Sequence, residues 1–532
     1  MTAPLDCLVI GYNEPATATH AAALARMGKT SPAYRDLALS VIEGEGGARS
    51  YMDLLDQFRP AGSPPMRCGA IPNLAAVYLV NMLQNSGLSA DWINLFQDEK
   101  DRLAMQLAQG VRCVAITTTF YVTNAPVHEI VAFIRARSDA RIVLGGPLVT
   151  NHLRNSQTPE ELAVALGDLG ADIYVADPEG ESTLCRLTRT LAEAGDLYQV
   201  PNLIFADGSR TLIAPEENPM DQRVIDWRRF APARLGPVVQ TRTARSCAFN
   251  CSFCSYPIRA GALALTSVER VIEELQALAA LGVRQLVFID DTFNVPLPRF
   301  KALCRAMIKR DWGFEWYSYL RCSNLDEEAI ALMVEAGCGG VFLGIESGSP
   351  AILKAMNKSA RTKHYRRGIK ALKQAGVLTF ASFILGFPGE TEETVAETLA
   401  FLDETAPDYY RIQPWYSEPG APIEAQRERY GITGGGFAWR HATMDSATAL
   451  DLIEEAFMEE RSALWLPQWS FDFWSIPYLR GRGMSFGDLK GFMRRANALH
   501  RQQFQMQSQA AAQRAHRDAL ADLRLHTSEV LA

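Results

Sequence analysis

Three cysteines lie within eight residues of this chain, in the order Cys247-Ala-Phe-Asn-Cys251-Ser-Phe-Cys254. A loop this short can bring three thiolates to one iron–sulfur cluster, for which cysteine is the usual ligand and which takes four ligands in all. The loop supplies three of them, so one iron is left open for a substrate or a cofactor. A structural zinc ion takes four protein ligands. The only candidate for the fourth ligand is His441, which is distant in the sequence. The spacing therefore favours a cluster over a zinc site or a redox pair.

At these residues the chain resembles the radical S-adenosylmethionine (SAM) superfamily, whose Cys-x3-Cys-x-aromatic-Cys signature has Phe253 at its aromatic position. The resemblance covers Val238 to about Pro422. It implies a [4Fe–4S] cluster on Cys247, Cys251 and Cys254 whose open iron binds the amino and carboxylate groups of SAM. An electron from an external donor then cleaves SAM into methionine and a 5′-deoxyadenosyl radical, which is chemistry that a side chain alone cannot do.

The same resemblance assigns SAM-binding roles to residues at the ends of successive strands. It places the amino group of SAM near Asp290, Asp291 and Thr292, the carboxylate near Arg321, the ribose near Glu346 and Ser347, and the adenine near Gly386 and Pro388. Structural alternatives stay open for three of these four groups. The two aspartates could be a helix cap and a solvated charge, Arg321 could form a structural ion pair, and the segment around Gly386 could be a tight turn before a helix.

Two series of alternating strands and helices would position these residues. Strand candidates of the second series lie at 238–242, 285–289, 315–320, 340–345, 379–385 and 410–414, with helical spacing between them. This predicts a partial (β/α)6 barrel of the TIM type, with its chemistry at the C-terminal ends of the strands. The first series has apolar strand candidates at 5–11, 91–96, 113–119, 141–147 and 171–175. Short helices between them indicate an α/β, Rossmann-like doubly wound parallel sheet.

These series predict the domain organisation of the chain. We expect a cobalamin-binding sheet domain at 1–194, a linker at 195–237, the radical SAM core at 238–425 and a small, mainly helical unit at 426–532 that covers the substrate. The stretch from Gln502 to Arg524 is expected to be a surface helix.

A parallel sheet ahead of such a barrel resembles the cobalamin-binding arrangement of part of the radical SAM family. Ligands of doubly wound sheets lie at the carboxyl ends of the strands, where the candidates are Thr117, Thr118, Thr119, Gly145, Gly146, Pro147, Glu179, Gly180 and Glu181. Hydroxyls and glycine N–H groups at a helix entrance suit a nucleotide tail with its phosphate, although each segment is also ordinary loop chemistry. We expect cobalamin between the sheet and the barrel, because the two cofactors must meet.

A departure from other cobalamin proteins concerns the lower face of the cobalt. The Asp-x-His-x-x-Gly motif that supplies a histidine ligand there is absent, since His20, His128 and His152 all lack that context. The resemblance therefore implies a cobalt with no histidine below it.

The resemblance implies a methyltransferase of an unactivated carbon or phosphorus centre in a natural product or peptide. In this branch a radical removes hydrogen from the substrate, which then takes a methyl group from methylcobalamin. The segments 6–14 and 439–445 resemble most the subgroup of phosphinothricin-type P-methyltransferases. Two alternatives stay open: a rearrangement, ring contraction or cyclisation on the same scaffold, and a cobalamin-binding sensor without catalysis.

Aromatic and basic residues gather after the predicted barrel, where Trp439, His441, Trp465, Trp469 and Trp474 occur with Arg440, Arg480 and Arg482. Aromatic walls and arginines match an anionic substrate. We therefore predict that this unit closes the mouth of the barrel, with Trp439 and His441 as substrate-binding or catalytic candidates. The alternative is that the tryptophans form a small core and the arginines are solvated.

The composition of the chain argues against two classes of partner, nucleic acids and membranes. Its 532 residues carry 53 Lys and Arg against 60 Asp and Glu, a net charge of −7, whereas a dedicated duplex-binding protein is normally basic. The sequence has no apolar stretch long enough to span a membrane and no apolar leader, so we expect a cytoplasmic protein without nucleic acid or membrane partners. The seven other cysteines are scattered among apolar residues and are expected to be small buried hydrophobes.

Overall fold

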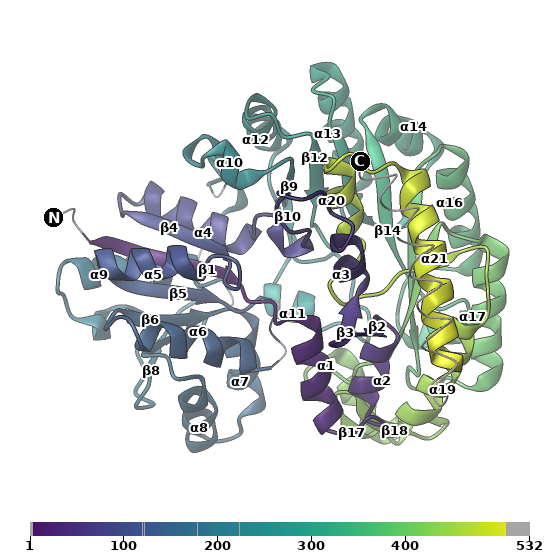
Figure 1. Cartoon of the computed structure of the whole chain (residues 1–532), viewed down its shortest axis with the longest axis horizontal. Coiled ribbons are helices and arrows are strands. Elements are labelled where there is room, and N and C mark those ends of the chain that lie inside the picture. Colours follow the sequence, from purple (N-terminus) through teal and green to yellow (C-terminus); the bar gives the residue numbers. More distant parts are fainter. Residues whose placement is uncertain are drawn as a thin grey trace. The chain divides into compact units, whose positions relative to one another are not determined.

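The computed structural model describes residues 4–119, 121, 123–177, 179–216, 218–222 and 224–506, and the chain divides into two compact units (Figure 1). The first unit contains residues 4–15, Gly69–Leu235 and Ala264–Leu278, and the second contains Ala16–Cys68, Gly236–Leu263 and residues from Ala279 onward. Most of the surface helix expected at 502–524 lies outside the described residues.

The first unit is built on a sheet with the order β4 (Ala90–Leu95), β1 (Leu5–Tyr12), β5 (Val111–Thr117), β6 (Arg141–Gly145), β7 (Ile173–Val175) and β8 (Leu203–Phe205). The first five strands pair in parallel, which confirms the predicted sheet, and β8 pairs antiparallel with β7. The stretch expected to be a linker thus contributes an edge strand. The order of the chain reverses at β1, so the β1–β5 boundary is the topological switch point at which such sheets bind ligands.

Helices cover both faces of this sheet because its strands are apolar on both sides. Leu8 and Ile10 of β1 are buried against α5 (Lys100–Gln109), α6 (Ala125–Arg135), α7 (Pro147–Asn155) and α8 (Pro159–Leu169). Contacts with β1 and β5 also come from α4 (Leu74–Asn85) and α9 (Glu181–Ala192), which lie on the opposite face.

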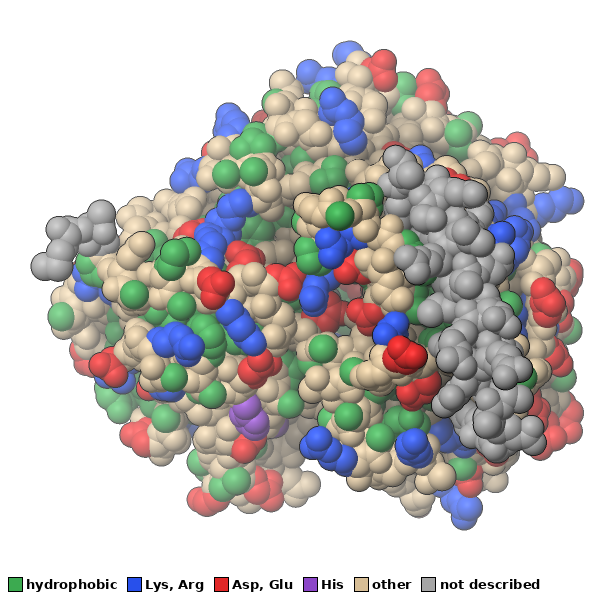
Figure 2. Space-filling model, viewed as in Figure 1, with side chains coloured by type: hydrophobic (Ala, Val, Ile, Leu, Met, Phe, Trp, Pro, Cys, Tyr) green, Lys and Arg blue, Asp and Glu red, His purple; other side chains and the backbone are tan. Residues whose placement is uncertain are grey.

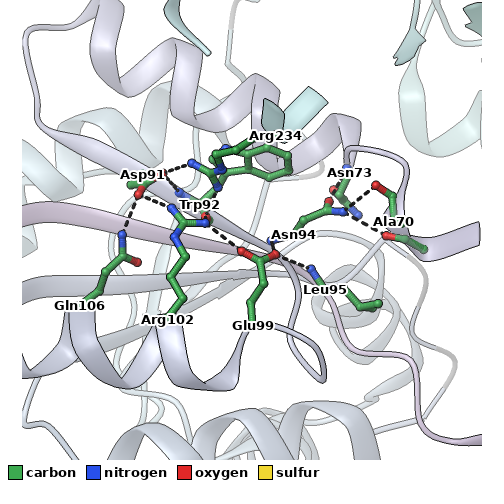
Figure 3. A network of polar contacts seen from close by, with 11 residues as sticks. Ala70, Asn73, Asp91, Trp92, Asn94, Leu95, Glu99, Arg102, Gln106 and Arg234 are labelled. Carbon is green, nitrogen blue, oxygen red and sulfur yellow. Dashed lines mark hydrogen bonds and ion pairs between the residues drawn. The ribbon is translucent and has the colours of Figure 1, made fainter. Parts of the chain in front are cut away.

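Edge strand β4 is held by a polar network (Figure 3). The Asp91 carboxylate accepts hydrogen bonds from Arg234 Nη1 and Gln106 Nε2, both at 2.6 Å, and Arg102 pairs with it as well. The Arg234 guanidinium also lies 4.6 Å from the ring centroid of Trp92. Because an edge strand presents unpaired backbone groups, these side chains both cover it and anchor it to α5.

The second unit is built on a parallel sheet with the order β9 (Val238–Thr241), β12 (Gln285–Phe288), β13 (Glu315–Leu320), β14 (Cys338–Glu346), β15 (Leu378–Leu385), β16 (Tyr409–Pro414) and β20 (Leu464–Trp465). The six predicted strands are confirmed, and β20 is a further strand. Among the described strands, β9 and β20 do not pair, so the sheet is a partial barrel. Helices α13 (Leu297–Arg310), α14 (Glu327–Glu335), α16 (Thr362–Gln374) and α17 (Glu392–Thr405) follow one another along its outside (Figure 1).

Residues 16–68, which we expected in the sheet domain, pack instead within the second unit. They form α1 (Thr17–Arg26), α2 (Pro32–Ala38), β2 (Val41–Gly44), β3 (Gly47–Ser50) and α3 (Tyr51–Asp56). The buried Arg411 of β16 donates to Leu39 O at 3.1 Å and pairs with Asp36 at 2.7 Å. Trp465 Nε1 of β20 donates to the same carbonyl at 3.0 Å. These long-range contacts have no local signal in the sequence.

The C-terminal part contains α19 (Ser446–Met458), α20 (Ser475–Gly481), α21 (Phe486–Gln505) and a small antiparallel sheet of β17 (Thr433–Gly435), β18 (Ala438–His441) and β19 (Met444–Asp445). Phe473 and Trp474 pack on Tyr317 and Tyr319 of β13. Arg480 forms two contacts of 3.1 Å with Glu315, at the N-terminal end of that strand. Arg480 therefore lies at the end of the barrel opposite the predicted SAM site, and the tryptophan-rich segment contributes to the core.

The remaining α-helices and strands of the described residues are α10 (Pro232–Leu235), α11 (Tyr256–Ala260), α12 (Val268–Ala280), α15 (Pro350–Ala355), α18 (Arg427–Tyr430), β10 (Ala244–Arg245) and β11 (Ala264–Leu265). Within the described residues, no helix is long and apolar enough to cross a membrane. Lys and Arg side chains lie among Asp and Glu on the visible face of the molecule (Figure 2).

Candidate active site

The three cysteines lie in the loop that follows β9, at the C-terminal end of the partial barrel. All three are free thiols; Cys251 is buried, and Cys247 and Cys254 are half-buried. Cys247 Sγ lies 3.2 Å from Thr292 Oγ1, in the segment after β12. Among the described residues, no three His, Cys, Asp or Glu side chains are arranged to hold a single metal ion. A cubic cluster is much larger than one ion, and its thiolate ligands stand on separate irons.

The two aspartates after β12 have different surroundings. The buried Asp290 carboxylate accepts hydrogen bonds from Thr243 N at 2.6 Å, Thr243 Oγ1 at 2.5 Å and Ala244 N at 3.0 Å, so it fixes the start of the cysteine loop. The Asp291 side chain is exposed to solvent, although protein atoms surround much of its carboxylate. Partial loss of water and the neighbouring Asp290 raise the pKa of Asp291 to about 7. Of the two, Asp291 is the carboxylate available to an ammonium group.

Arg321 follows β13 and is nearly fully buried. Asn294 holds its backbone through two hydrogen bonds of 3.0 Å. Its guanidinium lies 3.6 Å from the ring centroid of Phe249, within the cysteine loop. Its Nε and Nη2 atoms have no hydrogen-bond partner among the described residues. Since an unpaired buried donor is costly, this guanidinium fits an anionic ligand group such as the carboxylate of SAM.

Lys358 is a residue of this site that the sequence analysis missed. Its Nζ lies 2.7 Å from Glu346 Oε1, with each side chain only 10% exposed, and 5.5 Å from the ring centroid of Phe253. Burial raises the pKa of the Cys251 thiol, while the charges of Lys358 and Arg321 oppose that rise. The Lys358–Glu346 pairing depends on the fold, and no local pattern indicates it.

The ribose and adenine candidates are tightly packed. The hydroxyl of Ser347 contacts Thr398 Oγ1 at 3.1 Å and accepts a hydrogen bond from Ser349 N at 3.0 Å, so its bonds are made within the protein. Gly386 has a φ of +85° after β15, and a side chain there would collide with the ring of Trp439. Pro388, two residues on, is buried in the same turn.

Trp439 and His441 support that turn from behind. They are 3% and 4% exposed, and their rings stack at 5.2 Å. Trp439 Nε1 donates to Trp415 O at 2.7 Å, and His441 Nε2 lies 3.1 Å from Gly386 O. Burial lowers the pKa of His441, which favours the neutral imidazole. This packing favours the structural alternative for both residues over a substrate-binding role.

Small residues line the β5 and β6 ends of the first unit. Thr117 Oγ1 donates to Gly11 O at 2.7 Å across the β1–β5 switch point, and Thr118 Oγ1 donates to Gly145 O at 2.8 Å. Thr119 is exposed, and Pro147 begins α7. Gly146 has a φ of +102°, and a Cβ there would lie 3.0 Å from Thr118 Oγ1. Both hydroxyls are therefore used within the protein, and glycine at 146 is required by its backbone conformation and by the packing of Thr118.

The start of α9, where the sequence predicts that Glu179, Gly180 and Glu181 bind cobalamin, is already occupied by protein groups. Ser182 N and Thr183 N donate to the two carboxylate oxygens of Glu216 at 2.9 and 2.6 Å. Glu179 and Glu181 lie around Asn218, which contacts both, and Gly180 has no room for a side chain beside Val175. Because a carboxylate already caps this helix, its first N–H groups do not fit a phosphate, which corrects the expectation from the sequence.

The three histidines of the expected cobalamin domain have protein partners. His20 stacks on Trp469 at 3.9 Å in the second unit. In the first unit, His128 Nε2 lies 3.1 Å from Asp168 and His152 Nε2 lies 3.2 Å from Asn124 Oδ1. These contacts are compatible with a cobalt that has no histidine ligand, which stays a prediction.

Part of the chain matches a known protein family. Residues 241–402 match the model of the radical SAM superfamily. An uncharacterized methyltransferase of Pyrococcus horikoshii is 30% identical over 53% of this chain and 62% of its own length. The anaerobic magnesium-protoporphyrin IX monomethyl ester cyclase of Cereibacter sphaeroides is 27% identical over 66% of this chain and 60% of its own length. The chain thus spans less than two thirds of either relative.

Among solved structures, the radical SAM methyltransferase TsrM from Kitasatospora setae, with cobalamin and a [4Fe–4S] cluster bound, aligns with a TM-score of 0.55. The alignment covers 68% of this chain and 74% of TsrM at 21% identity, which shows a shared fold. The resemblance first indicated by three cysteines is confirmed, and the chain carries a radical SAM domain over residues 241–402.

Proposed function

We propose that this protein is a cobalamin-dependent radical SAM methyltransferase that acts on an unactivated carbon or phosphorus centre of a small-molecule or peptide substrate. The observation that carries the proposal is the cysteine loop after β9, flanked by the unpaired guanidinium of Arg321 and by the buried Lys358–Glu346 pair. When bound, a [4Fe–4S] cluster and SAM supply a carbon radical that removes hydrogen, and cobalamin supplies the methyl group.

The residues of the domain would bind and orient SAM beside the thiols. Cys247, Cys251 and Cys254 would hold the cluster, Arg321 would pair with the carboxylate of SAM, and Asp291 would accept from its ammonium group. Glu346, at the end of β14, would lie by the ribose. The turn at Gly386 has no side chain to exclude the adenine, although Trp439 fills the space behind it.

For cobalamin we propose the strand ends of β1, β5 and β6 in the first unit. Thr119 is exposed there, and these strand ends lie at the topological switch point of the sheet, where doubly wound sheets bind their ligands. The fold shared with TsrM, which was solved with cobalamin bound, supports cobalamin as a cofactor of this chain. Cyclisation on the same scaffold is the second candidate, and the likeness to a cyclase favours it.

Product analysis tests the proposal. The protein would be reconstituted without oxygen with iron, sulfide and cobalamin, then given methyl-labelled SAM and a strong reductant. Methyl transfer predicts both S-adenosylhomocysteine and 5′-deoxyadenosine, in equal yield once a substrate is present. 5′-Deoxyadenosine without S-adenosylhomocysteine would support cyclisation or rearrangement. Cobalamin binding without iron or either product would support a sensor.

A further inference from the structure

A strained segment contacts the cysteine loop. Glu346, Asn357 and Ser359 have φ values of 67°, 50° and 52°, a left-handed conformation that non-glycine residues rarely adopt. Such strain is unfavourable and persists where surrounding contacts over-determine it, often at functional sites. We name Glu346 together with Met356–Lys358 the clasp.

Three consecutive residues of the clasp contact the cysteine loop. Met356 O accepts a hydrogen bond from Ser252 N at 2.8 Å. Asn357 Nδ2 donates to Asn250 O at 2.7 Å. Lys358 Nζ lies 5.5 Å from the ring centroid of Phe253, within the range of a cation–π contact. The clasp therefore fixes the segment that carries Cys251.

The charges of the clasp act at short range in a place with little water. The 2.7 Å contact of Lys358 with Glu346 joins two side chains that are each 10% exposed. At Gly344 a Cβ would lie 2.5 Å from Glu346 Oε1 and 3.2 Å from Lys358 Nζ, so the glycine leaves room for the pair. Charges in such surroundings interact far more strongly than they do in water.

We propose that Lys358 is a positioning residue for the cysteine loop and that Lys358 and Glu346 set the reduction potential of the cluster in opposite directions. This inference rests on the proposed function, because it requires a cluster on the three cysteines. Reduction adds negative charge, which a nearby cation favours and a nearby carboxylate opposes. The two residues thereby adjust how readily the cluster accepts an electron from its donor.

A redox titration of the cluster-loaded protein without SAM, followed by electron paramagnetic resonance, tests the charge effect. We expect Lys358→Met to shift the potential to more negative values and Glu346→Gln to shift it to more positive values, with the double variant close to wild type. Lys354→Met, which removes an exposed lysine of α15, is the matched control and should leave the potential unchanged. Shifts of one sign in both single variants, or none, would overturn the charge effect.

Hydrogen exchange of the cofactor-free chain tests the positioning role. Residues 250–253 should exchange faster in Lys358→Met than in wild type or Lys354→Met, and Lys358→Arg should restore protection. Equal exchange in all four would overturn that role. If the wild-type chain bound no iron, the proposed function would fail, and the exchange comparison would still decide whether Lys358 positions the loop. If Lys358→Met did not fold, Lys358→Gln would replace it in both experiments, with the same expected and contradicting results, and Glu346→Gln would still test the charge effect by its own shift.

Discussion

His441 shows how one side chain can look catalytic in sequence and structural in three dimensions. Its imidazole is buried, stacked on Trp439 and 3.1 Å from Gly386 O. We expect His441→Ala to lower the free energy of unfolding by about 2 kcal/mol, because a cavity forms and a buried carbonyl loses its partner. Arg440→Ala, on the exposed side of the same strand, should change it by less than about 0.5 kcal/mol. Urea titration measures both, and equal stability of the two variants would contradict the structural role.

The sequence predicts the site residues that lie close together in the chain, and it does not predict those that only the fold brings together. The cysteines were predictable because their ligand spacing lies within one loop. Lys358 was not, because its partner Glu346 lies on another element and the lysine alone is an ordinary surface residue. Glu216 was missed for the same reason: it caps α9 from a loop more than 30 residues away. The sequence therefore suggested an open helix entrance that is in fact occupied.

The turn between β15 and α17 should make stability depend on pH. Glu390 is fully buried there, and its carboxylate accepts a hydrogen bond from Gly386 N. Burial raises its pKa to about 8, from 4.5. The folded chain keeps this proton while the unfolded chain releases it, so stability should decline as pH rises from about 4.5 to about 8.

The variant Glu390→Gln tests whether Glu390 causes this pH dependence of stability. The amide keeps an acceptor for Gly386 N and cannot ionise, so the variant should lose less stability than wild type between pH 5 and pH 8. From pH 5 to pH 8, wild type should lose roughly 3–5 kcal/mol more of its free energy of unfolding than the variant does. Glu392→Gln, exposed at the start of α17, should follow the wild-type curve. Parallel curves for Glu390→Gln and wild type would show that Glu390 ionises normally.

Elements with strong apolar runs were predictable, and short or inserted ones were not. All six predicted strands of the barrel lie within two residues of their observed positions. β20 is only two residues long, too short for a periodic pattern. Residues 16–68 follow directly after β1 in the chain, so proximity in sequence suggested the wrong unit.

In the second unit, Arg411 should hold residues 16–68 in place. Its side chain is fully buried and bonds to Asp36 and Leu39 O. We expect Arg411→Leu to lower the free energy of unfolding by about 3–5 kcal/mol, because it leaves a carboxylate and a carbonyl without their cation. Hydrogen exchange should rise in residues 36–50. Arg366→Leu, which removes an exposed pair with Glu404, should cost at most about 1 kcal/mol. Similar losses in both variants would argue against this role of Arg411.

For the whole molecule, the central claim is that Cys247, Cys251 and Cys254 together bind one [4Fe–4S] cluster that reacts with SAM. The most direct measurement is the iron and sulfide content of the reconstituted protein, compared with a variant in which all three cysteines are alanine. We expect about four irons per chain in the wild type. The variant should lose that iron and SAM cleavage, with cobalamin still bound. Iron content that is the same in both proteins would contradict this claim.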